Sequence, residues 1–234
     1  MIVLLFLILF CCQQLSAQDG LLQQVTDHYA AGYLTAVDHN AAIFSGNREQ
    51  PLGFLTSNHQ YFKEQGFTTG RLSFGGIIYP NVQLRWDLFR DDLIILSPKK
   101  YTIVLNAEDV DFFEIHGSHI FYKHPDVLAG CPPAGYYKLL YSTNKYVLFE
   151  KISKYLQEEN VKKYRYNFKM SSKFYLQRDD SYYRIQNKRT LLNSLGTHRK
   201  ELKQFMRANE LQYKKYPEIT VYETIKEHER LTRR

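Results

Sequence analysis

The chain has 234 residues, of which 44% are hydrophobic and 15% aromatic, and its formal net charge is +7. A chain of this size and composition can bury a sizeable core in one domain, and the lack of any later run of about 18 apolar residues excludes a transmembrane span from the mature chain. Tyrosine (19) and phenylalanine (15) are abundant while methionine (3) is scarce, a bias that favours β-structure.

The N-terminal residues 1–17 are predicted to be a signal peptide. They hold an apolar run of the usual length and end at Ala17, after which we expect cleavage, although the basic residues that normally precede such a run are missing. A lipoprotein with its lipid on Cys11 or Cys12 is the alternative, and it conflicts with Phe10, which stands where a small residue is expected. The prediction is an exported protein of the periplasm or outer-membrane periphery of a Gram-negative bacterium.

An irregular lead-in, residues 18–66, is expected to follow, with a short helix over residues 20–33 and turn-rich segments that cover an edge or end of a sheet. Residues 67–186 are predicted to form an antiparallel β domain, because apolar side chains alternate with polar ones at period two. The alternating positions between residues 70 and 122 are Leu72 and Phe74, then Val82, Leu84 and Trp86, then Tyr101, Ile103 and Leu105.

Turn residues separate these strands into a meander of five or six. Gly75 and Gly76 suit a tight hairpin, and a further hairpin is expected at His116 and Gly117. After a loop rich in proline and glycine at 123–135, two more hairpins are predicted, residues 136–141 with 145–151 and residues 164–177 with 182–185. The fold class is therefore α+β, mainly β: a curled antiparallel sheet that could form a partial barrel.

The tail changes to a helical period. Residues 187–234 are predicted to form a basic region of small amphipathic helices packed on the sheet, one with Thr197 as its N-cap and a final one that opens at Pro217. The apolar positions of these two helices are Leu202, Phe205 and Met206, then Val221, Tyr222 and Ile225.

Several short motifs resemble those of a group of uncharacterised exported proteins of Gram-negative bacteria. They are Phe44-Ser45-Gly46, Asn58-His59-Gln60-Tyr61-Phe62 and the spaced pattern of Gly70, Leu72, Phe74, Gly76, Tyr79, Asn81, Val82, Leu84, Trp86 and Asp87, with looser similarity at Tyr182-Tyr183-x-Ile185 and residues 188–195. The chain departs from the group at Trp86, where tyrosine is usual. The resemblance implies a β-rich fold and export, and it implies no catalytic residue because no activity is assigned to the group.

Charge is unevenly distributed. Residues 1–135 carry 8 Lys and Arg against 13 Asp and Glu, net −5, whereas residues 136–234 carry 23 against 11, net +12. Cations alternate with aromatic residues at Lys162, Lys163, Arg165 and Lys169, which fits either a strand with one solvated face or contact with an anionic surface component. Nucleic acid is not expected as a partner, because an exported protein rarely meets it.

The best metal-binding candidates are Glu114, His116 and His119. If Ile115 and Ile120 point inward across the hairpin, the two histidines and the carboxylate meet on its outer face and could hold a divalent transition metal. The alternative is a polar hairpin tip with no ligand, and no cofactor is predicted.

Other candidate catalytic groups are weaker. Asp87 with Asp91 and Asp92 could form an acid pair, but a hairpin turn accounts better for Asp91 and Asp92, and no nucleophile elbow or phosphate-binding loop occurs. His59 suits a packed loop residue. Cys131 is the one cysteine expected in the mature chain, and nothing near it in sequence activates a thiol.

The sequence therefore predicts a non-catalytic cell-envelope protein that binds another envelope protein or an anionic surface component. Two alternatives stay open. One is a metal- or carboxylate-dependent hydrolase that uses residues 109–124. The other is a periplasmic carrier of an apolar ligand, with Phe74, Tyr79 and Trp86 lining its cavity.

Overall fold

The computed structural model describes residues 42–124, 128, 130–158 and 165–233. The predicted signal peptide, the expected helix over residues 20–33, and Lys162 and Lys163 lie outside the described residues.

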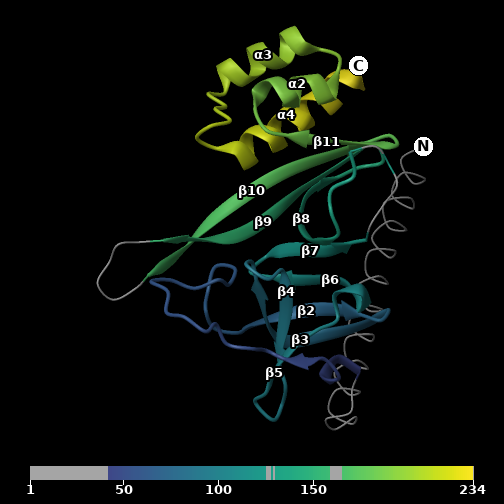
Figure 1. Cartoon of the computed structure of the whole chain (residues 1–234). Coiled ribbons are helices and arrows are strands. Elements are labelled where there is room, and N and C mark those ends of the chain that lie inside the picture. Colours follow the sequence, from purple (N-terminus) through teal and green to yellow (C-terminus); the bar gives the residue numbers. More distant parts are fainter. Residues whose placement is uncertain (1–41, 125–127, 129, 159–164, 234) are drawn as a thin grey trace, which may run out of the picture.

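The described residues form an 11-stranded antiparallel sheet with the order β1-β5-β4-β3-β2-β6-β7-β8-β9-β10-β11 (Figure 1). The sheet does not close, since β1 and β11 stand at its two ends. The strands are β1 (Asn47–Arg48), β2 (Thr68–Phe74), β3 (Ile77–Asp87), β4 (Asp92–Leu96), β5 (Thr102–Val104), β6 (Val110–Ile115), β7 (Ser118–Lys123), β8 (Gly135–Ser142), β9 (Tyr146–Glu158), β10 (Tyr166–Arg178) and β11 (Ser181–Ile185).

The predicted meander is confirmed, and its turns lie where the sequence indicated them. Gly75 and Gly76, with φ of 59° and 75°, join β2 to β3, and His116 and Gly117, with φ of 49° and 71°, join β6 to β7. Within the lead-in, β1 pairs with β5 at one end of the sheet. Two short 3₁₀ helices, η1 (Ala42–Phe44) and η2 (Ala107–Asp109), complete this half.

Strands β9 and β10 are the longest, and β9 continues well past the predicted end at residue 151. They pair with each other over all of their 13 residues. At about 3.3 Å per residue the ribbon extends for roughly 40 Å. It runs diagonally from the C-terminal helices toward the N-terminal half (Figure 1), so it connects the two ends of the molecule.

Two separate cores use the same face of this ribbon. Leu148 and Leu176 lie beneath the helices in one core, whereas Ile152 packs into the core of the N-terminal strands, which is centred on Trp86. Near that second core, the ring of Phe168 meets Phe89 at a centroid distance of 5.3 Å. The opposite face carries a small aromatic cluster of Tyr137, Phe149, Tyr175 and Tyr182.

Three helices follow the sheet within the described residues: α2 (Lys188–Leu195), α3 (Arg199–Ala208) and α4 (Pro217–Thr232). Figure 1 shows them gathered over the end of the sheet formed by β9–β11. Pro217 opens α4 as predicted, because its fixed φ suits the first helical position.

The start of α3 corrects one prediction, because Thr197 is not its N-cap. His198 takes that position in the left-handed conformation, with φ of 53° and no side-chain cap. The Thr197 hydroxyl lies 3.1 Å from Nε2 of His228 on α4 instead. The Thr197 hydroxyl therefore contacts the buried His228 of α4 and does not cap α3.

Candidate binding site

The alternation of side chains along β9 and β10 leaves a polar stretch between the two cores. Glu150 and Lys154 of β9, with Met170 and Ser172 of β10, share the face that carries Leu148 and Ile152. The helices cover the Leu148 end and the N-terminal core covers the Ile152 end. These four polar or exposed residues, with Ile152, line a hollow of about 410 Å³, here named the central cleft.

An ion-pair network holds the wall of the central cleft. Lys138 of β8 lies 2.8 Å from Glu218 at the start of α4 and 3.7 Å from Oε2 of Glu150. Glu150 is only 4% exposed, and its Oε2 has no hydrogen-bond partner among the described residues. Burial raises the pKa of this carboxyl, since the charged form is poorly solvated. The network ties the helices to the sheet.

Lys154 anchors a loop to the other side of the central cleft. Its Nζ donates to the carbonyls of His59 and Tyr61, both at 2.8 Å. Burial lowers the pKa of Lys154, and burial followed by the Lys154 charge lowers the pKa of His59. His59, which the sequence suggested to be a packed loop residue, lines the central cleft.

A second hollow of about 630 Å³ lies beside β10, where β11 and the connection between α3 and α4 approach it. It is named the basic groove because Lys173, Arg184 and Lys214 line it and no carboxylate does within the described residues. All three cations are exposed. Its lining residues are Ser171, Ser172, Lys173, Phe174, Arg184, Ile185, Gln186, Asn187, Tyr213, Lys214 and Pro217. Ser172 also lines the central cleft, so the two hollows meet at β10.

The three predicted metal ligands are not brought together. Glu114 and His119 face each other across the β6–β7 pair, with Oε1 and Nδ1 3.5 Å apart. His116 lies in the turn, where its positive φ breaks the alternation, and its Nε2 lies 3.3 Å from the Thr68 hydroxyl. In the part of the chain that the structure describes, no three His, Cys, Asp or Glu side chains form a group suited to a metal ion.

Of the predicted cationic residues, the two that the structure describes, Arg165 and Lys169, do not line the basic groove. Arg165 is exposed and 3.3 Å from Glu158, its neighbour across the β9–β10 ribbon. Lys169 lies on β10 opposite Tyr155, four residues before Lys173. The sequence thus identified the basic half correctly but not the groove, because Lys173, Arg184 and Lys214 meet only through folding.

The acidic residues proposed for catalysis have structural partners. Asp87 is fully buried, and its Oδ1 accepts hydrogen bonds from the backbone N–H of Phe89 and Arg90 at 2.8 and 3.0 Å. Asp91 pairs with Lys151 of β9 and accepts from the Tyr136 backbone N–H at 3.2 Å. These carboxylates shape the β3–β4 turn and join it to β8 and β9.

The side chains suggested for an apolar cavity fill the N-terminal core instead. Trp86, Tyr79 and Phe74 are all buried there. The Trp86 ring packs edge-on against Phe113 and Tyr136 at centroid distances of 5.9 and 6.4 Å.

Cys131 is half-buried, and its sulfur contacts the Pro132 carbonyl at 3.3 Å.

Comparison of the chain with protein-family models, curated proteins and solved structures finds no match. The resemblance to exported β-rich proteins therefore stays a prediction. Within the described ranges, no helix is long and apolar enough to cross a membrane.

Proposed function

We propose that the protein is a non-catalytic, exported binding protein of the cell envelope that holds an anionic partner in the basic groove. The observation that carries the proposal is the composition of that groove: three exposed cations from three separate segments line it, and no carboxylate among the described residues does. Uncompensated charge of one sign attracts a partner of the other sign and steers its approach.

The surroundings support a binding role for the groove. Phe174 and Ile185 line the groove and belong to the core beneath the helices, so packing fixes this part of the groove. The half of the chain that supplies them has a net charge of +12. Export itself is inferred from residues 1–17 and is a separate part of the proposal.

Reversal of the groove charges tests the proposal. The variant combines Lys173→Glu, Arg184→Glu and Lys214→Glu. Its matched control makes the same change in net charge on the exposed residues of α3, Lys200→Glu, Lys203→Glu and Arg207→Glu, which do not line the groove. The probes are a fluorescein-labelled oligoglutamate peptide and vesicles that contain phosphatidylglycerol, and binding is followed by anisotropy and by co-sedimentation.

Each exposed ion pair contributes about 0.5 kcal/mol, so loss of three pairs weakens binding about tenfold or more. We expect this loss in the groove variant, a smaller loss in the α3 control, and weaker binding at higher salt. Equal losses in both variants would mean that net charge alone attracts the probes. That result, or no binding of either probe to the wild type, would refute the proposal.

A further inference from the structure

Strand β10 has one fully paired edge and one edge that is only partly paired. It pairs with β9 along its whole length, but β11 covers it only at residues 174–178. At the other end, Ser57 N–H donates to the Tyr166 carbonyl at 3.0 Å. The Asn58 side chain then binds both backbone groups of Phe168, accepting from its N–H at 2.7 Å and donating to its carbonyl at 2.9 Å.

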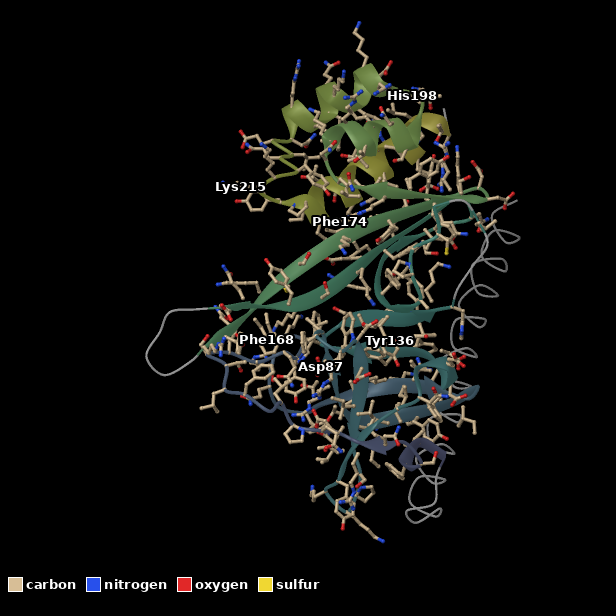
Figure 2. All side chains as sticks on the ribbon, in the orientation of Figure 1. Asp87, Tyr136, Phe168, Phe174, His198 and Lys215 are labelled. Carbon is tan, nitrogen blue, oxygen red and sulfur yellow. The ribbon has the colours of Figure 1, made fainter. Side chains whose placement is uncertain are left out.

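These contacts show which backbone groups of β10 point away from β9. Tyr166 and Phe168 bond outward at one end, and Phe174 pairs with Ile185 of β11 at the other. Because N–H and C=O groups alternate sides every second residue, Met170 and Ser172 also point outward. Within the described part of the chain no backbone hydrogen bond covers this edge, and the Met170 residue is 66% exposed. Phe168 and Phe174, both labelled in Figure 2, mark the two ends of this open edge.

A local sequence signal keeps the edge open. Continued β11 pairing would place the residues after Ile185 beside Ser172, but the chain turns into α2 there. The Thr190 hydroxyl accepts from the N–H groups of Gln186 and Asn187 at 2.9 and 3.0 Å, and Asn187 caps the helix. The capping box therefore uses the backbone groups that would have extended β11.

Charge beside the open edge selects the kind of strand that can bind there. Lys173 and Lys169 lie on β10 itself, and Arg184 and Lys214 complete the basic groove beside residues 171–174. Two copies of this chain that paired edge to edge would bring their lysines together, which is unfavourable. An acidic strand would gain both backbone hydrogen bonds and ion pairs.

We propose that the open edge of β10 at residues 170–172 receives an extended acidic segment of a partner protein. The segment adds a short strand to the sheet by backbone pairing with Met170 and Ser172, and its carboxylates lie on the basic groove. The six residue steps from Phe168 to Phe174 span about 20 Å, so a strand of about four residues fits between the Asn58 contact and β11. This inference rests on the proposed function and specifies the partner's class and its mode of binding.

The test uses the full chain and a synthetic peptide of alternating glutamate and threonine. A second peptide of the same sequence is N-methylated at every residue, so it keeps its charge and lacks backbone N–H donors. We expect the first peptide to bind at least tenfold more tightly than the second. In hydrogen-exchange NMR we expect it to slow exchange at the Met170 and Ser172 amides, with little change at Ser171, whose amide already pairs with β9.

Two variants check the edge from the protein side. Ser172→Pro removes the outward N–H without removing a bond to β9, a substitution that edge strands accept, whereas Ser172→Ala keeps the N–H and removes only the hydroxyl. We expect the proline variant to lose peptide affinity and the alanine variant to keep it. Circular dichroism reports whether the proline variant folds, and the methylated peptide tests the wild type independently of that result.

The outcomes separate this inference from the proposed function. If both peptides bind equally, and the charge-reversed groove variant still loses binding, strand addition is wrong while the basic groove stands. If the chain forms dimers that Ser172→Pro abolishes, the edge binds a second copy and the acidic partner is wrong. If no anionic probe binds, both proposals fail.

Discussion

His228 should make the stability of the helical end depend on mild acid. The residue is 1% exposed on α4, and its two ring nitrogens lie 2.9 Å from the Tyr146 hydroxyl and 3.1 Å from the Thr197 hydroxyl. Burial, together with the smaller effects of the nearby charges of Lys145, His198 and Arg178, lowers the pKa of His228 from 6.5 to about 4. The folded state therefore favours the neutral ring.

The size of the effect follows from this difference in pKa. The unfolded chain takes up the proton at about pH 6.5, but the folded chain does so only near about pH 4, so the unfolded state is favoured as the pH falls between these values. The contribution of His228 is fully present above about pH 6.5. About 2 kcal/mol of this contribution is lost between about pH 7 and about pH 5. The total loss reaches about 3 kcal/mol once the pH falls below the pKa of the folded state.

The measurement is the free energy of unfolding in urea at a series of pH values, for the wild type and for His228→Gln. Glutamine can bond to both hydroxyls without titrating, so the difference between the two proteins isolates His228 from carboxyls such as Glu150, whose raised pKa acts in the opposite direction. Circular dichroism reports the helices, and the fluorescence of Trp86, the single tryptophan, reports the N-terminal core. Parallel pH profiles for the wild type and the variant would refute the reasoning.

Two further predictions concern contacts that hold the sheet together. Lys151→Met leaves the half-buried Asp91 carboxylate without its ion pair, so we expect the free energy of unfolding to fall by about 2 kcal/mol. Adding Asp91→Asn should recover about half of this loss. A double-mutant cycle that shows no coupling between the two positions would contradict the prediction. Asn187→Ala removes the cap of α2 and should cost about 1 kcal/mol, whereas Asn187→Asp should keep most of the stability, as measured by thermal unfolding. Equal melting temperatures for the alanine variant and the wild type would exclude a role for the cap.

The strands of the meander could be predicted because local signals agree there. Alternation fixes one buried face, as at Leu72, Leu84 and Ile103, and glycine marks the tight turn at Gly75. The same reasoning underestimated β9, because Lys154 interrupts the apolar positions Ile152 and Leu156 on one face, and this part of the strand depends on pairing with β10. A strand supported mainly by a distant partner gives little local signal.

Two residues were misplaced for different physical reasons, one a local backbone conformation and the other a contact from a distant helix. His116 was expected on the outer face of its hairpin beside Glu114, but a positive φ turns it toward Thr68. Thr197 has the residue type of an N-cap, yet a buried histidine from α4 takes its hydroxyl. The cap at Asn187, with Thr190 three residues later, is by contrast a local pattern that the sequence does contain.

The candidate binding surface could not be found from sequence, because its parts come from distant segments. The central cleft combines residues from His59 to Glu218, and the basic groove combines β10, β11 and the connection before α4. Only the total charge of the C-terminal half was visible. The open edge of β10 depends on where β11 stops, which the capping box decides.

The polarity of the β9–β10 ribbon argues that its middle is kept open for a partner. The inward face carries apolar side chains where a core covers it, as at Leu148 and Ile152, whereas Glu150 lies between the two cores and Lys154 lies just beyond Ile152. A ribbon that served only to join two cores would be more stable with aliphatic residues there, since burying a carboxylate beside a lysine seldom repays its desolvation. Met170 and Ser172 line this cleft and also lie on the open edge of β10, so the cleft and the proposed strand-binding edge adjoin each other.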